Sequence, residues 1–395
     1  MSALDRREVL RLLGALGAAG ATAPVLAGCN VSTAPAAGPV NPVRVGLVIP
    51  QTGANKAIGD ELNAGFRLYL RRHGDHLGGR PVQVSTADEG ETAETGRAAV
   101  DRLLKDSVHV ISGVASSAVM SAVRDQVEAA QVPLLGSNAS PSTLGSVKYI
   151  WRTSFVNTDP SMALGGYLAS KSGQSVYVVS DGTPSAAEQV SGFLTAFTGV
   201  AGHPDLAATP AQLVPGNIGQ TLTAIRTSNA HHVFAVFSSG DVASAFFQAY
   251  RSLGLAVPVY SPGFVTEGAA ALQRLGELAM GLYTAMNYGP DLDNAANRTF
   301  AAEYQRAYGN APGTYAMAAY DAAAVLDKAL ALAGTDLNPQ AVNAALAKVG
   351  RLDSPRGAWQ FNQSRTPLQR WYLRQVRKNG RVLVNAVLGD LGMLG

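Results

Sequence analysis

The sequence predicts an α/β fold made of two doubly wound, Rossmann-like units in tandem. From Val43 the chain alternates short, β-rich apolar runs with longer segments of helical apolar spacing, which is typical of a parallel sheet covered by helices. The alternation starts again after residues 149–159, without a residue-level repeat. The end of the chain is rich in strands, and Lys378-Asn379-Gly380 has the composition of a hairpin turn.

The expected elements follow in chain order. The first unit has strands at VRVGLVI, PVQVSTAD, VHVISG and VPLLGS and helices at 60–72, 92–105 and 119–130. The second has strands at SVYVVSD, 211–214, HHVFAVFSS and VPVYSP and helices at 160–171, 186–200, 219–228 and 241–253. A strand at LYTAMNY, helices at 295–308, 314–333 and 338–349, and strands at GAWQFN and 371–388 complete the chain. Because helices return after the second unit, we expect the chain to cross back between two lobes.

Residues 1–28 predict an export signal that is no part of the fold. Arg6 and Arg7 precede an apolar stretch rich in alanine and glycine and resemble a twin-arginine pattern. Leu26-Ala27-Gly28-Cys29 resembles a lipobox, in which Cys29 becomes acylated. The alternative is that Cys29 is an incidental small residue of a signal peptide or of a membrane anchor helix.

The segment that follows predicts a flexible tether. Residues 29–42 are rich in Pro, Ala, Gly and Ser, and they would connect the lipid to a domain that begins near Val43. No later apolar run has the length needed to span a bilayer.

Composition and missing motifs argue against several functions. The 395 residues carry 31 basic and 28 acidic side chains, a net charge of +3, which is too neutral to predict a nucleic-acid partner. Cys29 is the one cysteine, so acylation would leave no thiol nucleophile. G-x-S-x-G, G-x-G-x-x-G and G-x-x-x-x-G-K-[ST] do not occur. His73 and His76 lie among glycines that end the helix, so we expect them to bind no metal. Because the motifs above are missing, we also expect no cofactor and no enzymatic activity.

Two strand ends of the first unit are suited to hold a small acid. Residues 113–118 and 136–140 carry small side chains where helix N-termini point N–H groups outward. Ser116, Ser117 and Ser140 could add hydroxyl donors to a carboxylate. The alternative is that these serines only cap the helices that follow.

Other side chains leave two interpretations open. Arg152, at the first crossing between the units, either braces a hinge or is solvated at a strand end. Five aromatic residues near expected strand ends or helix starts belong either to the core or to a ligand wall: Trp151, Tyr260, Phe264, Tyr315 and Tyr320.

The chain from Val43 to about Leu388 resembles the type I periplasmic binding proteins of the leucine/isoleucine/valine-binding family. The resemblance lies in VRVGLVIPQTGANKAIGDELNAGFRL, LGGRPVQVSTAD, VHVISGVASSAV, VPLLGSNAS, YIWRTSF and YGNAPGTYAMAAYDAAAVL, together with the lipoprotein signal. It implies two α/β lobes joined by three crossings that close over a ligand, in a protein that delivers a solute to an ABC permease. The implied lobes are 43–153 plus 288–352 and 154–287 plus 353–395.

The resemblance also implies a binding site. Ser117 and Ser140 would hold the carboxylate of an amino acid, with Ala115 and Asn138 beside the ligand and Tyr315 lining the pocket.

The second lobe departs from the family pattern. Where the family has an aspartate followed by Y-G-x-G, this chain reads Asp181-Gly182-Thr183-Pro184-Ser185-Ala186, so an aromatic lid is missing. Ser238 or Ser239 replaces another aromatic residue, and the acid that binds the ligand's ammonium group aligns near Gly263, followed by Phe264. Either Asp181, Asp241 or Glu267 takes over that role, or the ligand lacks an α-amino group, because a buried ammonium needs a partner.

These features together predict a membrane lipoprotein on the extracytoplasmic side that binds a small carboxylate for an ABC importer. An amino acid is the leading ligand class, followed closely by an aromatic or aliphatic organic acid. A receptor of the same fold that signals to a membrane partner is the alternative, and an enzyme on a similar scaffold is disfavoured because no nucleophile and base pair emerges.

Overall fold

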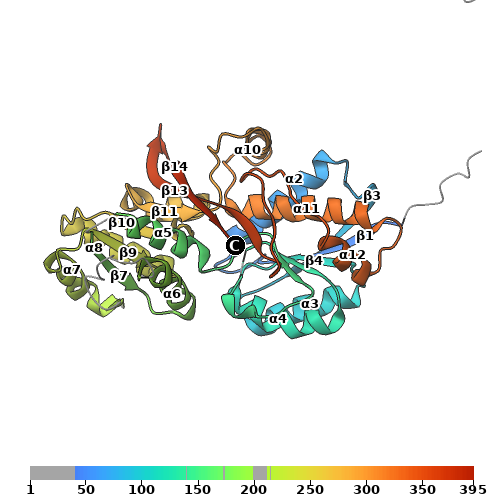
Figure 1. Ribbon diagram of the computed structural model, residues 1–395, viewed down its shortest axis with the longest axis horizontal. Coiled ribbons are helices and arrows are strands. Elements are labelled where there is room, and N and C mark those ends of the chain that lie inside the picture. The colour runs from blue at the N-terminus through green and yellow to red at the C-terminus, as the bar shows by residue number, and fades with distance from the viewer. Residues whose placement is uncertain (1–40, 139, 172–173, 199–210, 214) are drawn as a thin grey trace, which may run out of the picture. The chain divides into compact units, whose positions relative to one another are not determined.

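The computed structural model describes residues 41–395 except 139, 172–173, 199–210 and 214 (Figure 1). The export signal, Cys29 and nearly all of the tether that the sequence predicts lie outside the described residues. Within the described part of the chain, no helix combines the length and apolar character needed to cross a membrane.

The first sheet has the strand order β2-β3-β1-β4-β5-β6 and is parallel except where β2 meets β3. In the register, Val45 of β1 lies opposite Val84 of β3 and Val110 of β4. Every residue of β1 except Arg44 is buried, because helices cover both faces of the sheet. The strands are β1 (Val43–Ile49), β2 (His76–Leu77), β3 (Arg80–Asp88), β4 (Val110–Gly113), β5 (Leu134–Gly136) and β6 (Ile150–Arg152).

Two helical layers enclose the first sheet, and with it they form the first lobe (Figure 1). One face carries α3 (Ala93–Lys105), α4 (Ser117–Ala130) and the short helix η1 (Ser142–Leu144), and the other carries α2 (Lys56–Arg72), α11 (Thr314–Ala333) and α12 (Pro339–Leu346), with α10 (Ala295–Tyr308) packed on α2. A Cβ atom on Gly65 of α2 would lie 1.9 Å from the carbonyl oxygen of Ala316, so glycine lets α2 and α11 pack closely. The return of the chain to the first lobe after the second unit is confirmed.

The second sheet has the order β12-β13-β11-β10-β9-β7-β8, and β14 pairs with β13. The neighbouring strands β8, β7, β9, β10 and β11 are parallel to one another. Strand β13 pairs antiparallel with β11, β12 and β14. The predicted hairpin is confirmed, with its turn between Asn379 and Val382. The strands are β7 (Val176–Ser180), β8 (Ala211–Gln212), β9 (His232–Val236), β10 (Val259–Pro262), β11 (Tyr283–Met286), β12 (Gln360–Phe361), β13 (Pro367–Asn379) and β14 (Val382–Leu394).

Helices pack on both faces of this sheet as well, and together they form the second lobe. One apolar cluster joins the sheet to α5 (Asp159–Ala169) and α6 (Pro184–Thr198). The opposite cluster involves α7 (Ile218–Thr227), α8 (Gly240–Ser252) and α9 (Ala269–Leu275). Short 3₁₀ turns complete the lobe: η2 (Pro215–Asn217), η3 (Gly263–Thr266) and η4 (Gly276–Ala279).

The structure differs from the sequence prediction mainly at short elements. Helix α2 begins one turn earlier than expected, and an ion pair of 2.6 Å between Lys56 and Asp60 spans that added turn. Helix α9 and the turns η3 and η4 were not predicted, because segments of four to seven residues are too short to show a helical period.

A buried polar network joins the three crossings between the sheets. The carbonyl oxygen of Ser154, in the first crossing, accepts hydrogen bonds from Asn287 of the second crossing (2.9 Å) and Arg356 of the third (2.9 Å). Gln369 of β13 donates a further bond of 2.8 Å to the same oxygen. Arg356 also forms an ion pair of 2.9 Å with Asp321 of α11, and each of these two side chains is 1% exposed. The exact residue limits of the lobes stay a prediction.

Arg152 is buried beside this network. Its guanidinium donates a hydrogen bond of 2.7 Å to the carbonyl oxygen of Ser364, and the side chain is 4% exposed. The interpretation of Arg152 as a solvated strand-end residue is therefore wrong, and the bracing interpretation fits.

Candidate functional site

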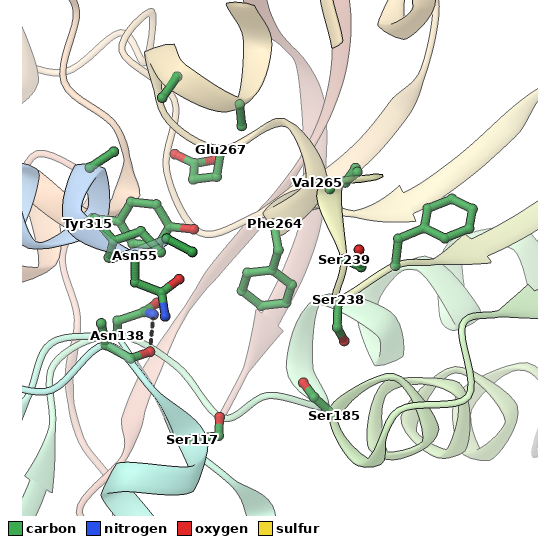
Figure 2. Close-up of a pocket in the computed structure, with 18 of the residues that line it drawn as sticks. Asn55, Ser117, Asn138, Ser185, Ser238, Ser239, Phe264, Val265, Glu267 and Tyr315 are labelled. Carbon is green, nitrogen blue, oxygen red and sulfur yellow. Dashed lines mark hydrogen bonds between the residues drawn. The ribbon is translucent and has the colours of Figure 1, made fainter. Parts of the chain in front are cut away.

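A cavity of about 500 Å³ lies at the carboxyl ends of the strands and is lined from both lobes (Figure 2). In the first sheet the strand order reverses beside β1, and in the second it reverses beside β7. Loops that leave a sheet at such a reversal form a crevice suited to a ligand. Most lining residues follow β1, β4 and β5 in the first lobe and β7, β9 and β10 in the second, while Phe155 and Asn157 follow β6 and Tyr315 lies in α11.

Four aromatic rings contribute to the apolar part of the wall: Phe155, Phe237, Phe264 and Tyr315. The rings of Phe155 and Phe264 are 5.3 Å apart between centroids. Figure 2 shows the Phe264 ring between Tyr315 and Asn138 on one side and Ser238 on the other. Such a wall favours a ligand with a flat apolar body, because ring contacts add to the free energy of burial.

The loop after β4 is held by a carboxylate of the protein itself. The backbone N–H groups of Ala115 and Ser116 donate hydrogen bonds of 2.7 Å each to Glu89. Glu89 is fully buried, and this burial raises its pKa to about 7. The loop was expected to offer its N–H groups to the carboxylate of a ligand, and two of those groups already have this internal partner.

The second lobe uses the same arrangement at the start of α8. The carboxylate of Asp181 accepts hydrogen bonds from the backbone N–H groups of Ser238 (2.5 Å) and Ser239 (3.1 Å). Ser239 then caps α8 by accepting a hydrogen bond from the N–H of Val242 (3.4 Å). Asp181 therefore braces this loop.

The structure brings six of the nine predicted ligand-binding residues to the cavity wall: Ala115, Ser117, Asn138, Ser239, Phe264 and Tyr315. Asp181 is not among the lining residues. Ser116 is not among them either, and its hydroxyl caps α4 by accepting a hydrogen bond from the N–H of Val119. For Ser116 the capping interpretation fits, whereas Ser117, one residue later, faces the cavity.

Ser140 is the third predicted residue that lies outside the wall. It is fully buried, and its N–H group donates to the side chain of Asn157 at 3.4 Å. The family resemblance had assigned a contact between the ligand and the Ser140 hydroxyl. In the structure, Asn157 lines the cavity and Ser140 does not. Of the other aromatic candidates, Trp151, Tyr260 and Tyr320 pack in or against the hydrophobic cores.

Several lining residues were missed from the sequence. Asn157 donates to the hydroxyl of Ser117 (3.1 Å) and to Glu188 of α6 (3.2 Å), and so links the two lobes below the cavity. Arg274 of α9 also lines the cavity. The other polar residues missed are Asn55, Ser185 and Gln189. Asn55 and Ser185 lie in segments that were compared with the family pattern but were given no role there, and the other three belong to no motif.

The acidic residues of the wall differ in what surrounds them. Glu267 forms an ion pair of 2.8 Å with Arg374 and accepts a hydrogen bond of 2.6 Å from the N–H of Thr314. Asp241 lies in the first turn of α8 and is exposed. Glu61 lies behind Glu267, where burial and the Glu267 carboxylate raise its pKa to about 8. Glu267 is thus already neutralised by Arg374, and Asp241 is the remaining free carboxylate of the described wall.

No group of three or more His, Cys, Asp or Glu side chains is placed to hold a metal ion in the described ranges. The site is thus a two-sided crevice with an aromatic wall, hydroxyl and amide groups, and one cationic residue, Arg274.

Comparisons with known proteins agree with this architecture. A family model described as periplasmic binding protein matches residues 42–381. The Leu/Ile/Val-binding protein homolog 6 of Brucella abortus is 29% identical over 348 residues, which cover 85% of this chain and 88% of the relative.

Two solved structures share the fold. The solute binding protein of an ABC transporter from R. palustris, in complex with benzoate, is 27% identical with a TM-score of 0.75, and the match covers 89% of this chain and 98% of that one. A leucine binding protein from Thermotoga maritima is 17% identical with a TM-score of 0.74, covering 87% and 99%. The second likeness concerns the fold alone.

Proposed function

The chain belongs to the periplasmic binding protein family, and on this premise we propose that it is the solute-binding protein of an ABC importer. The family consists of extracytoplasmic solute-binding proteins. The twin-arginine pattern and the lipobox of the sequence support export and a lipid anchor on Cys29. The anchor would keep the binding protein near its permease at the membrane surface.

We propose an aromatic carboxylic acid without an α-amino group as the ligand. The composition of the cavity wall carries this proposal. The wall contains four aromatic rings and one arginine, and its buried acid, Glu267, is already in an ion pair with Arg374. An ammonium group would meet only Asp241, whose exposed carboxylate is screened by water and adds little binding free energy. The benzoate complex of the R. palustris relative supports the same ligand class.

The two-sided wall supports a closure mechanism. Ser117 and Asn138 would contact the ligand from the first lobe, and Phe264 would cover it from the second. A ligand that touches both walls binds the closed state more tightly than the open one, and this difference in affinity is what drives closure. The permease would then recognise the closed form.

Calorimetric titration of the purified full-length chain tests the ligand class. We expect benzoate and 4-hydroxybenzoate to bind and leucine and phenylalanine to bind more weakly by at least about tenfold, because burying an unpaired ammonium is unfavourable. Phe264→Ala should weaken benzoate binding, whereas Phe361→Ala serves as the control for general damage, because the Phe361 ring is partly buried against the first-lobe core and does not line the cavity. Tighter binding of the amino acids would refute the proposed class.

Two cell experiments test the anchor and the importer role. Labelling with radioactive palmitate should mark the natural chain and not Cys29→Ser. Deletion of the gene should abolish uptake of radiolabelled benzoate. Normal uptake combined with benzoate binding in vitro would contradict the importer role and favour a receptor.

A further inference from the structure

Helix starts are the usual places where a protein offers N–H groups to an anion, and two of the helix starts at this cavity, those of α4 and α8, are partly occupied. Glu89 takes the N–H groups of Ala115 and Ser116, and Asp181 takes those of Ser238 and Ser239. An incoming carboxylate therefore competes with an internal carboxylate at each start. A cationic side chain is a partner for the ligand's acid that avoids this competition.

Arg274 is that partner on geometric grounds. It is the one lining residue of the described wall with a cationic side chain. A Cβ atom built on Gly240 would lie 2.5 Å from Cζ and 2.8 Å from Nε and Nη1 of Arg274, so the guanidinium rests against the first residue of α8. Gly240 also lines the cavity, which places the charged end of Arg274 at the wall.

The charges around Arg274 leave its guanidinium available. Among the described residues, none forms an ion pair or hydrogen bond with it, although Asp241 lines the same wall. Arg374, the other cation near the cavity, is 1% exposed and is bound to Glu267. A carboxylate of a ligand is thus the group that fits the five donors of Arg274, because guanidinium and carboxylate can form two parallel hydrogen bonds.

We propose that Arg274 binds the carboxylate of the ligand, so that the acid enters with its charged group toward the second lobe and its ring against Phe264 and Tyr315. This orientation differs from the one that the sequence resemblance implied, in which Ser117 and Ser140 of the first lobe hold the carboxylate. The proposal rests on the proposed function and adds the residue that selects acids over neutral analogues. Because Arg274 belongs to the second lobe, binding of the carboxylate would contribute directly to closure.

The test compares benzoate with benzamide, a neutral molecule of nearly the same shape, by calorimetry on the full-length chain. Arg274→Gln should weaken benzoate binding by about two- to fivefold, as expected for an ion pair whose arginine is exposed, and leave benzamide binding unchanged. Arg226→Gln is the matched control, because Arg226 is also an exposed arginine of the second lobe but does not line the cavity.

Gly240→Ala gives an independent test that keeps the charge. The added methyl group would occupy the place of the guanidinium and push this flexible side-chain end aside, while the backbone of Gly240 already has a conformation that alanine can adopt. We expect weaker benzoate binding in this variant and unchanged benzamide binding. Thermal melts of each variant check that the fold is kept.

The outcomes separate this proposal from the proposed function. If the natural chain binds benzoate and Arg274→Gln binds it equally well, the assignment of Arg274 is wrong while the ligand class stands. If Arg274→Gln weakens benzoate and benzamide equally, Arg274 shapes the wall and does not recognise charge, which also overturns the proposal. If the natural chain binds no aromatic acid, the proposed ligand class itself fails.

Discussion

Replacing Glu61 with glutamine should remove a pH-dependent loss of stability. Glu61 of α2 accepts a hydrogen bond from the backbone of Gly313, and its Oε2 atom is buried without a partner in the described part of the chain. Cβ atoms on Gly268 and Gly313 would each lie 2.6 Å from its carboxylate oxygens, so the group is tightly enclosed. Burial and the nearby Glu267 carboxylate raise its pKa from 4.5 to about 8.

The direction of the effect follows from proton binding. Between the unfolded pKa and the folded pKa, the folded chain holds a proton that the unfolded chain has released, so the free energy of unfolding falls as pH rises through this window. A difference of one bound proton changes the free energy of unfolding by about 1.4 kcal/mol per pH unit, and this slope halves near the folded pKa. From pH 6 to pH 8, Glu61 should therefore lower the free energy of unfolding by about 2 kcal/mol. Tyr304, Tyr315 and the ion pair of Glu267 with Arg374 face the same group, and they remain in the variant.

Urea unfolding at pH 6 and pH 8 measures this difference. Glu61→Gln should lose about 2 kcal/mol less than the natural chain between the two pH values. Glu277→Gln, in which the changed side chain is 69% exposed, should behave like the natural chain. An equal loss in Glu61→Gln and the natural chain would mean that Glu61 is ionised in the folded protein, and the reasoning would be refuted.

Four further substitutions test other parts of the structure. Ser117→Ala should weaken benzoate binding by about 1 kcal/mol, whereas Ser140→Ala should leave it unchanged; calorimetry that shows equal losses would contradict the placement of Ser140 outside the wall. Asp321→Ala should lower the free energy of unfolding by about 3–5 kcal/mol, because the buried charge of Arg356 loses its partner; a urea midpoint close to that of the natural chain would show that the carbonyl partners of Arg356 suffice. Glu89→Gln should remove a loss of about 2–3 kcal/mol in the free energy of unfolding between pH 5 and pH 8, because the natural Glu89, whose pKa is raised to about 7, releases its proton in the folded chain over this range; an equal loss in the variant would argue against this titration.

Much of the fold could be predicted from apolar spacing. The expected ranges of α10 and α11 agree with the structure at both ends, because each helix is long enough to repeat its apolar stripe several times. Most strands of both sheets were recognisable because burial on two faces makes them continuous apolar runs, as in Val110–Gly113, whereas β2 and β6, of two and three residues, were missed.

The binding site was predictable mainly in the loops that follow strands, and for Tyr315 of α11 from the family resemblance. Ser117 and Asn138 follow β4 and β5, so topology alone brings them to the crevice. Arg274 lies in a helix of seven residues without a periodic signal, and a lone arginine in such a segment has the sequence appearance of a solvated one. The role of Glu89 depends on its meeting a loop 26 residues away, which local spacing does not encode.

The hinge network has a consequence for how the chain folds. The carbonyl oxygen of Ser154 accepts hydrogen bonds from side chains 133, 202 and 215 positions further along the chain. Closing such long loops is entropically unfavourable and slow, so we expect these bonds to form late, after much of each lobe has collapsed. Since β13, which carries Gln369, is among the last segments to be synthesised, a chain released before this strand would expose the unpaired edge of β11 and be a target for proteolysis.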